Sequence, residues 1–526
     1  MVKGERLDIF LPEELNLGSF FLDINIQSGR GEKTALYYQD KRITYQDLWV
    51  LTNKVGNVLR ELGVEPENRI LLVLQDSPEW VASWLAAMKI GGVGTHAYTY
   101  LKVDDYSYLL DLIRPKVVVA DHTTIDLLRK ASQHSKYPRA FLVAGEHAGG
   151  LGAREYYFND MVASANEDLE VEKSHRDDLA FWNFSGGTTG KPKGVPHMHR
   201  DGVLSFESFN YVMDYTADDV VIRVPKLFFH YARDLGLLFP LRAGASVVLF
   251  PERTTAKIIF ELVDKFRATV LINVPTMMRA MIQTPENERS DLSCLRRVMS
   301  SGEMLSAKLY GEWVDAFGTE VVNRFGSAES AMGYLCNRPG LVVPGSSGTV
   351  TPMVEVKIVD SEGQTVPEGQ PGVLLCRSVA AALSYVREHE KTLSTFLGNE
   401  WINTGDIFQK DENDYFWYLG RADDMVKVSG VWVSPLEIER CLQKHPNVRE
   451  CAVMGLRDED GLTKLKAFVA LEKESDILDD TADELKNYCN TNLASYKYPR
   501  YIEFMEELPK TGQGKIDKRE LRSRKL

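Results

Sequence analysis

The chain contains the stretch Phe184-Ser185-Gly186-Gly187-Thr188-Thr189-Gly190-Lys191-Pro192-Lys193-Gly194-Val195. Its four glycines, three hydroxyl side chains and two lysines offer backbone N–H groups, side-chain donors and positive charge, which together suit a polyphosphate. The stretch is not a Walker motif, because three residues separate Gly186 from Gly190 and Pro192 stands where that motif has Ser or Thr. The alternative interpretation is a polar, glycine-rich surface turn.

The segments on both sides of this loop follow the pattern of parallel strands covered by helices. Residues 69–74 form an apolar run typical of a buried strand, and a helix is predicted over 78–88 with Ser77 as its cap. Further along, a helix over 306–317 followed by a strand over 321–325 predicts another βαβ unit.

The pattern changes twice in the last third of the chain. From about Val354, apolar residues alternate and a turn leads to a return strand over 372–376, which predicts an antiparallel subdomain. After residues 420–424 a last unit begins, and Ser434-Pro435-Leu436-Glu437 predicts a capping box at a helix start.

We therefore predict an α/β fold in two domains. Residues 1–422 would form a large domain of parallel and mixed sheets with helices and a small β-barrel-like subdomain. Residues 423–526 would form a small α+β domain.

Composition excludes several classes of protein. The 526 residues include 62 Lys and Arg against 75 Asp and Glu, and the net charge of -13 argues against nucleic acid as a partner. The apolar runs are shorter than the roughly 18 residues of a membrane span, and the N-terminus lacks an apolar signal core. The six cysteines form no Cys-x-x-Cys pair, so we expect a reduced, cytoplasmic protein without a zinc site.

Six segments, in order, resemble the adenylate-forming superfamily of acyl-CoA ligases, peptide-synthesis adenylation enzymes and luciferases. They are residues 184–195, Ser301-Gly302-Glu303, Asn323-Arg324-Phe325-Gly326-Ser327-Ala328-Glu329, Trp401-Ile402-Asn403-Thr404-Gly405-Asp406, Gly420-Arg421-Ala422-Asp423-Asp424 and Pro509-Lys510-Thr511-Gly512-Gln513-Gly514-Lys515-Ile516. The resemblance covers nearly the whole chain and is closest to the benzoate-CoA ligase branch. It implies ATP, Mg²⁺ and coenzyme A as cofactor and co-substrates.

The resemblance implies a nucleotide site with adenine stacked on Phe325 and the ribose hydroxyls bound by Asp406, with Arg421 as a donor. Packing against the sheet, and a structural salt bridge, are the alternatives. The residues assigned to ATP or AMP in this way are Ser185, Gly186, Gly187, Thr188, Thr189, Gly190, Lys193, Ser301, Gly302, Glu303, Asn323, Arg324, Phe325, Gly326, Ser327, Ala328, Asp406 and Arg421.

Two residues are the catalytic candidates that the resemblance implies. Lys515 would neutralise the charge that builds up between a carboxylate and the α-phosphate, and Glu329 would bind Mg²⁺. An exposed lysine in a basic tail and a plain surface acid are the alternatives. Ala328 departs from the family, which usually has Thr before this Glu, and one phosphate contact is lost with that hydroxyl.

The acyl group is expected to bind along Phe229, His230, Tyr231 and Ala232, which resemble the pocket wall of the benzoate-CoA ligases. An aromatic-rich core strand is the alternative. Tyr231 disfavours ortho-hydroxylated acids, and Gly333 is expected to enlarge the pocket floor. A benzoate-like acid and a cyclohexane- or cyclohexene-carboxylate are therefore both predicted substrates.

The resemblance also implies a second half-reaction in which the C-terminal domain rotates about Asp423. That rotation would withdraw Lys515 and bring in Ser429, Gly430, Val431 and Trp432 along the coenzyme A tunnel.

The predicted function is an ATP-dependent carboxylate–CoA ligase that forms an acyl-AMP and then a thioester, releasing AMP and pyrophosphate. Its partners would be a small carboxylic acid, ATP and CoA, with no membrane span, and a homodimer is a candidate assembly. One alternative is an adenylating enzyme that loads the phosphopantetheine of a carrier protein. Another is a nucleotide sensor without catalysis.

Overall fold

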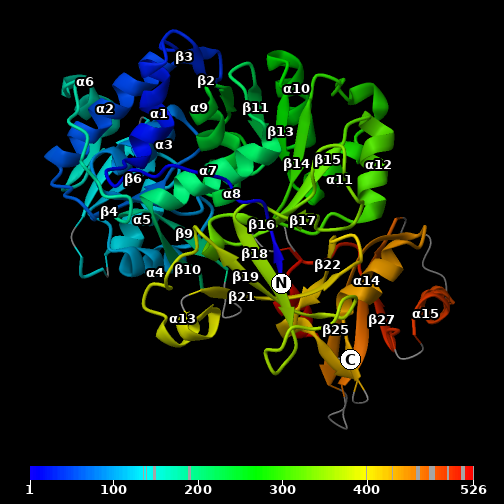
Figure 1. Ribbon diagram of the computed structural model, residues 1–526. Helices are drawn as coiled ribbons and strands as arrows, with labels where there is room; N and C mark the ends of the chain where they lie inside the picture. The colour runs from blue at the N-terminus through cyan, green and yellow to red at the C-terminus, as the bar shows by residue number, and fades with distance from the viewer. Residues whose placement is uncertain are drawn as a thin grey trace.

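The computed structural model describes residues 1–133, 135–137, 139–145, 150–186, 191–398, 400–428, 431–457, 463–472, 480–494, 497–510 and 516–524. Two helix-covered sheets make up most of the molecule, a smaller antiparallel sheet lies beside them, and the C-terminal unit follows (Figure 1). The predicted α/β class, with a large N-terminal part and a small C-terminal one, is confirmed.

The first large sheet has seven strands in the order β10-β9-β5-β4-β6-β7-β8. All neighbours are parallel except the β9–β10 pair, which is antiparallel. The strands are β4 (Arg69–Val73), β5 (Val93–His96), β6 (Val117–Asp121), β7 (Ala140–Ala144), β8 (Glu155–Tyr157), β9 (Leu179–Ser185) and β10 (Lys193–Met198).

The second large sheet has nine strands in the order β17-β16-β15-β14-β13-β11-β12-β2-β3. Its central strands are parallel, and antiparallel pairs close both edges. The strands are β2 (Thr34–Tyr38), β3 (Lys41–Thr44), β11 (Val220–Arg223), β12 (Ser246–Leu249), β13 (Val270–Asn273), β14 (Arg297–Ser300), β15 (Val321–Gly326), β16 (Gly333–Cys336) and β17 (Thr349–Val350).

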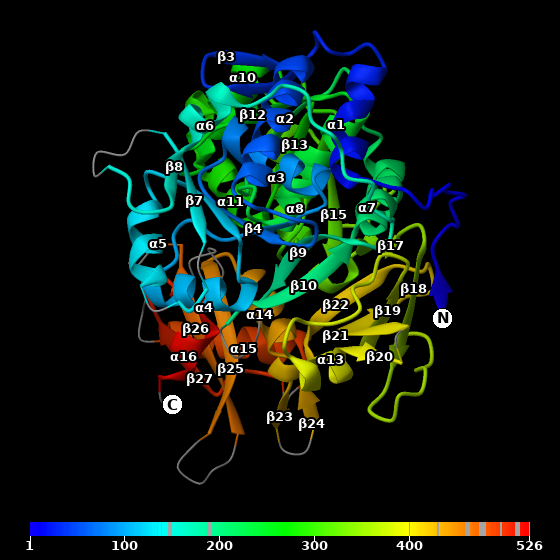
Figure 2. The same cartoon turned by 90° about the vertical axis from the view of Figure 1, so that its left-hand side faces the viewer.

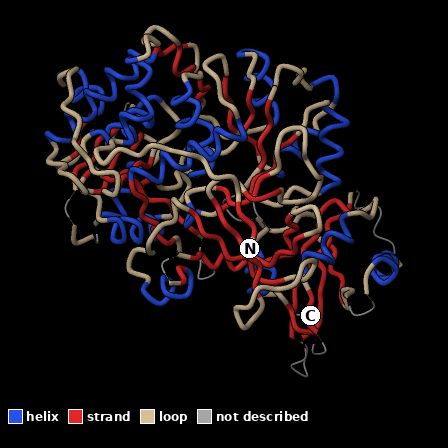
Figure 3. Tube along the Cα trace, in the orientation of Figure 1, coloured by secondary structure: helices blue, strands red, loops and turns tan. Residues whose placement is uncertain are grey.

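Helices lie between the two large sheets and on their outer faces (Figure 3), and further helices belong to the small sheet and to the C-terminal unit. They are α1 (Leu17–Gln27), α2 (Tyr45–Glu61), α3 (Pro78–Lys89), α4 (Val103–Ile113), α5 (Ile125–Ser132), α6 (Phe158–Ser164), α7 (His199–Met213), α8 (His230–Arg233), η1 (Asp234–Leu238), α9 (Phe239–Ala243), α10 (Ala256–Phe266), α11 (Pro275–Gln283), η2 (Glu286–Glu288), α12 (Ala307–Phe317), η3 (Ala328–Ser330), α13 (His389–Thr395), η4 (Ala422–Asp424), α14 (Pro435–Gln443), α15 (Thr481–Asn492) and α16 (Lys518–Arg522).

Strand β4 explains why the layers form. Successive side chains of a strand point to opposite faces of the sheet. Ile70 and Leu72 accordingly enter the core shared with the second sheet, whereas Leu71 and Val73 pack under α4 and α5. Because both faces are covered, the strand reads as a continuous apolar run. The predicted helix after it is confirmed: Ser77 caps α3 through a hydrogen bond from Trp80 N (3.2 Å).

The antiparallel subdomain is a six-stranded sheet that the N-terminus joins. Strand β1 pairs with β18, and the order continues β19-β21-β20 with β22 on β21. The strands are β1 (Val2–Lys3), β18 (Val354–Val359), β19 (Gly372–Ser378), β20 (Phe396–Leu397), β21 (Trp401–Lys410) and β22 (Phe416–Arg421).

The C-terminal unit lies to the left of and below this sheet in Figure 2 and contains a hairpin and a three-stranded sheet. Its strands are β23 (Val426–Val428), β24 (Val431–Val433), β25 (Val448–Arg457), β26 (Thr463–Leu471) and β27 (Tyr501–Phe504). The predicted capping box at α14 is wrong: Ser434 Oγ donates to Leu419 O, and Glu437 pairs with Lys497 (2.8 Å).

Candidate active site

The glycine-rich loop connects two antiparallel strands. Ser185 at the end of β9 is opposite Lys193 at the start of β10, and a Cβ at Gly186 would meet nothing within 4 Å. Gly187, Thr188, Thr189 and Gly190 lie outside the described residues. The described ends of the loop thus place a hydroxyl, an open backbone and a lysine side by side.

Glu329 is the buried acid of the site. It lies in η3 after β15, and the Tyr385 hydroxyl donates to its Oε1 at 2.6 Å. Burial alone would raise the pKa of Glu329, but hydrogen bonds from Tyr385 and Ser185 outweigh it and the pKa is lowered. Glu329 is therefore an ionised carboxylate at neutral pH.

Lys193 faces the same tyrosine. Its Nζ is 4.0 Å from the centroid of the Tyr385 ring. Burial lowers the pKa of Lys193, and the charge of Glu329 opposes that effect. Tyr385, which the motifs did not indicate, therefore connects the loop lysine with the buried acid.

Phe325 belongs to an aromatic cluster. Its ring centroid is 5.6 Å from that of Tyr334, 5.1 Å from Phe408 and 5.2 Å from Tyr418. Next to it, a Cβ at Gly326 would be 2.8 Å from Gly333 Cα, so only glycine permits this approach of the two backbones.

Asp406 and Arg421 are opposite each other on β21 and β22. Arg421 Nη1 is 3.2 Å from Asp406 Oδ1 and donates to Thr404 O at 2.8 Å. Burial raises the pKa of Asp406 to about 6, although Arg421 lowers it, and the charge of Glu329 adds to the rise. Glu329 and Asp406 are thus close enough to interact electrostatically.

The remaining predicted nucleotide residues surround the ends of β14 and β15. Ser301 donates to Arg324 O (3.0 Å), and Asn323 donates to Ser346 O (3.3 Å) while its own Oδ1 is buried without a partner. Gly302 has a φ of +84° and open space at its Cβ position, and Glu303 follows it. Ser327 and Ala328 lead from β15 into η3.

Arg324, which the resemblance assigned to the nucleotide, lies on the other face of β15 from Phe325. Side chains alternate along β15, so Arg324 points to the face opposite Phe325. Its guanidinium Cζ is 4.6 Å from the centroid of the Phe209 ring and 5.9 Å from that of Tyr231. Arg324 therefore lies with a predicted acyl-pocket residue instead of with the aromatic cluster of Phe325.

The predicted acyl wall begins α8. Phe229 and His230 are half-buried, and Ala232 is fully buried. The hydroxyl of Tyr231 donates to Asn273 O (2.9 Å) and lies 3.3 Å from Met299 O. Because the hydroxyl is already hydrogen-bonded to backbone carbonyls, only the ring of Tyr231 is left to contact a substrate.

Gly333 does not enlarge a pocket floor, contrary to the sequence-based expectation. A Cβ there would be 2.6 Å from Arg324 Nε and 2.6 Å from Phe209 Cζ. The room left by the missing side chain is thus filled by those two side chains.

Several predicted C-terminal residues lie outside the described residues: Ser429, Gly430 and Lys515. Val431 and Trp432 belong to β24, with Trp432 opposite Lys427 on β23. Asp423 is exposed in η4 directly after β22.

The last helix is tied to the residue after Asp423. Arg522 Nη2 is 2.8 Å from Asp424 Oδ1. Lys518 Nζ is 3.6 Å from Asp424 Oδ2 and 3.7 Å from Oε1 of the buried Glu439. Before the 511–515 segment, Lys510 pairs with Glu450 on β25.

A magnesium ion fits the chemistry of this site. Mg²⁺ takes few protein carboxylates and keeps water and phosphate oxygens as its other ligands. Among the described residues, no group of three or more His, Cys, Asp or Glu side chains gathers as a protein-only metal cage would need. Glu329, ionised and with one oxygen held by Tyr385, is a suitable single ligand.

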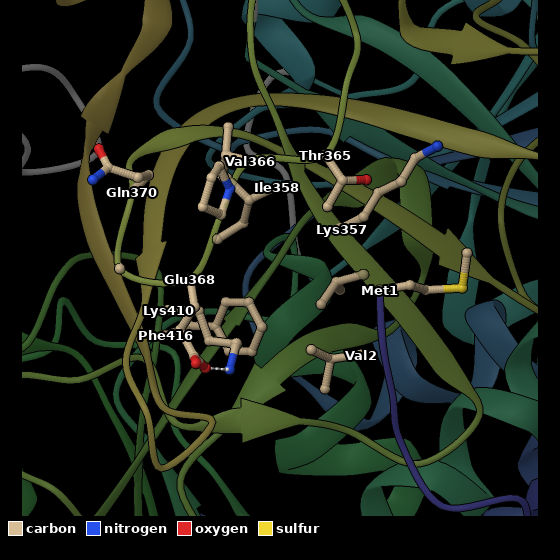
Figure 4. Close-up of a pocket in the computed structure, with 13 residues that line it drawn as sticks. Met1, Val2, Lys357, Ile358, Thr365, Val366, Glu368, Gln370, Lys410 and Phe416 are labelled. Atoms are coloured by element: carbon tan, nitrogen blue, oxygen red, sulfur yellow. Dashed lines mark hydrogen bonds and ion pairs between the residues drawn. The ribbon is translucent and has the colours of Figure 1, made fainter.

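A separate cavity of about 210 Å³ lies on the small sheet, between its strands β1 and β18 and the 365–370 segment, and none of the predicted site residues lines it (Figure 4). The Lys410–Glu368 ion pair is part of its wall. No helix in the described part of the chain is long and apolar enough to cross a membrane.

Comparison with known proteins agrees with this geometry. The AMP-binding enzyme family matches residues 25–386, and the AMP-binding enzyme C-terminal domain matches residues 437–515. The chain belongs to the AMP-binding enzyme family. A 4-hydroxybenzoate–CoA/benzoate–CoA ligase of Rhodopseudomonas palustris is 36% identical over 98% of this chain and 95% of its own.

Solved structures of the family are also similar. The crystal structure of an anthranilate CoA ligase in complex with anthranoyl-AMP has a TM-score of 0.91 and 38% identity over 98% of both chains. A benzoate CoA ligase from Burkholderia xenovorans has a TM-score of 0.87 and 34% identity over 96% of this chain and 99% of its own.

This chain is accordingly an acid–thiol ligase of the AMP-forming, benzoate-CoA ligase-like type. It uses ATP, Mg²⁺ and CoA with a carboxylic acid. Transfer to a carrier protein, the alternative from the sequence, is not favoured, because the similar enzymes are CoA ligases.

Proposed function

We propose that this ligase activates a small cyclic carboxylic acid, either benzoate-like or a cyclohexane- or cyclohexene-carboxylate. The proposal rests on one site, in which the charge of Glu329 acts on both Lys193 and Asp406, and which lies beside the Phe325 cluster. The curated relatives support the acid class, since one from Thauera aromatica is a benzoate–CoA ligase with 35% identity.

The nucleotide would bind across the site formed by Lys193, Glu329 and Asp406. Phe325 would stack on adenine, and Asp406 would accept hydrogen bonds from the ribose hydroxyls with Arg421 beside it. Ser185, Lys193 and the 187–190 segment would contact the phosphates. Ser301, Gly302, Glu303, Asn323, Gly326, Ser327 and Ala328 would form the surrounding backbone wall.

In the first half-reaction, a carboxylate oxygen of the acid attacks the α-phosphorus of ATP. The bond from that phosphorus to the bridging oxygen breaks, and pyrophosphate leaves with the electron pair. Lys193 and Lys515 would offset the negative charge that develops, and loss of one such preorganised donor typically costs ~10²–10³ in rate. Glu329 would hold magnesium, which would supply positive charge against the negative charge of the phosphates.

In the second half-reaction, the thiolate of CoA attacks the acyl carbonyl and the bond to AMP breaks. We propose residues 1–422 and 423–526 as the two moving parts, with Asp423 as pivot. Ser429, Gly430, Val431 and Trp432 would then form the pantetheine path. The exposed position of Asp423 between the two parts supports the pivot.

We also propose a cytoplasmic location. All six cysteines are free and five are buried, which suits a reducing compartment.

The experiment is pyrophosphate release with purified enzyme, ATP, Mg²⁺ and CoA. The acids would be benzoate, cyclohexanecarboxylate, cyclohex-1-enecarboxylate and, as a control, octanoate. We expect the highest kcat/KM with a cyclic acid. A higher kcat/KM with octanoate would contradict the proposed acid class. Absence of pyrophosphate release with every acid of the panel would contradict the proposed activity.

A further inference from the structure

Arg324 is a nearly buried cation next to the proposed acyl site. Only 6% of the residue is exposed, and its guanidinium lies over Phe209 and Tyr231. Across the strand pair it is opposite Cys336, a buried thiol whose pKa is raised by burial and which is therefore neutral. The immediate surroundings of Arg324 are two aromatic rings and a neutral thiol.

No described residue gives Arg324 an ion pair or a hydrogen bond from its guanidinium, and its Nε is buried without a partner. The hydroxyl of Tyr231 donates its hydrogen bond to Asn273 O and not to Arg324. Asp234, the carboxylate that acts on Arg324 at longer range, already pairs with Arg233 Nε (2.7 Å).

The other buried arginines in the described part of the chain each have a carboxylate or carbonyl partner, although each also buries one guanidinium nitrogen without a hydrogen bond. Arg223 pairs with Asp76 at 2.5 Å, Arg233 pairs with Asp234, and Arg139 donates to Tyr137 O. Buried arginines are rarely left unpaired, because removing the charge from water is costly. The aromatic contacts of Arg324 offset only part of that cost.

Arg324 lies close to both the proposed nucleotide site and the proposed acyl wall. A Cβ at Gly326 would be 3.1 Å from Arg324 Nη2, and Gly326 is the residue at which the strand approaches the proposed nucleotide site. The guanidinium Cζ is also 5.9 Å from the ring centroid of Tyr231, which belongs to the proposed acyl wall. An acid whose ring lies against that wall would bring its far edge towards the guanidinium.

We propose that Arg324 binds a second oxygen acceptor on the ring of the acid, a carboxylate or a hydroxyl, in addition to the carboxylate that reacts. This inference rests on the proposed function and narrows its substrate class. A guanidinium gains most from an anionic acceptor, so a second carboxylate should be preferred to a hydroxyl.

The test compares kcat/KM for thioester formation with benzoate, 3- and 4-hydroxybenzoate, isophthalate and terephthalate. We expect the wild-type enzyme to prefer at least one oxygen-bearing acid over benzoate by about 10-fold or more. Arg324→Met should lower kcat/KM for the preferred oxygen-bearing acid by about 10-fold or more relative to benzoate, and Arg324→Lys should retain part of that preference.

Thermal unfolding of the free enzyme gives an independent readout. Replacing an unpaired buried charge by Met should leave Tm unchanged or raise it, whereas a structural arginine would lower it. Equal losses for benzoate and every other acid in Arg324→Met would overturn the proposal, because Arg324 would then act on the reacting carboxylate or the nucleotide. If Arg324→Met does not fold, the wild-type panel decides, and preference for benzoate over all four other acids overturns it. Absence of pyrophosphate release with every acid would instead refute the proposed function.

Discussion

Replacing Tyr385 by Phe removes one hydroxyl and should weaken adenylation. The hydroxyl donates to the buried, ionised Glu329 at 2.6 Å, and a hydrogen bond to a charged group contributes ~1.5–3 kcal/mol. If this energy is realised in the transition state, kcat/KM falls by about 10- to 150-fold. The cation–π contact with Lys193 remains possible, because phenylalanine keeps the ring.

The assay is pyrophosphate exchange as a function of Mg²⁺ concentration. Loss of a group that orients a metal ligand commonly costs about 10- to 100-fold in metal affinity or activity, so half-saturating Mg²⁺ should rise in Tyr385→Phe. Tyr215→Phe is the matched control, because its buried hydroxyl donates to Leu235 O (2.6 Å) far from Glu329 along the chain. The control should lower Tm but leave the Mg²⁺ dependence unchanged. The reasoning is refuted if Tyr385→Phe has wild-type kcat/KM and wild-type Mg²⁺ dependence.

Three further changes test other parts of the site. Burial raises the pKa of Asp406 to about 6, so its ionisation lowers the stability of the folded enzyme as pH rises from about 4 to 6. Asp406→Asn should therefore stabilise the free enzyme by roughly 1–3 kcal/mol at pH 8 but not at pH 4, and it should raise KM for ATP. A lower Tm of the variant at pH 8 would contradict this. In the wild type, KM for ATP should rise as pH falls through about 6, when Asp406 gains a proton. Gly326→Ala places a Cβ 2.8 Å from Gly333 Cα and should lower stability by ~1–3 kcal/mol in chemical denaturation, whereas no loss would mean that the strands can separate. Lys515→Ala should slow adenylation ~10²–10³-fold yet leave thioester formation from supplied acyl-AMP near the wild-type rate, and equal losses in both steps would argue against a rotating domain.

The layers of the fold could be predicted from local sequence, because a strand covered on both faces must be apolar throughout. Residues 70–73 satisfy that rule, and Ser77 with Pro78 marks the helix that follows. Strand β1 could not be predicted, since its two residues owe their conformation to pairing with residues 355–356. The capping box at 434–437 failed because the Ser434 hydroxyl bonds to a carbonyl in β22, fifteen residues earlier.

The site was predictable where short motifs carry the residues, as for Glu329 and Asp406. Tyr385 carried no such signal: it is 56 positions from Glu329, and only the packing of the small sheet against η3 brings the two together. The position of Arg324 was available in principle, because neighbours of Phe325 on a strand must face the other way.

The ion pairs between Asp424 and α16 bear on how the C-terminal part would rotate. Asp424 is the first residue beyond the proposed pivot, and α16 follows the 511–515 segment. On its other side that segment begins next to Lys510, which β25 holds through Glu450. In the proposed rotation both attachment points would therefore turn together, with the spacing between them unchanged. The hydrogen bonds from Ser434 to Leu419 O and from Arg440 to Tyr418 O cross the pivot, so the exchange would have to break them as well as change the backbone torsions at Asp423.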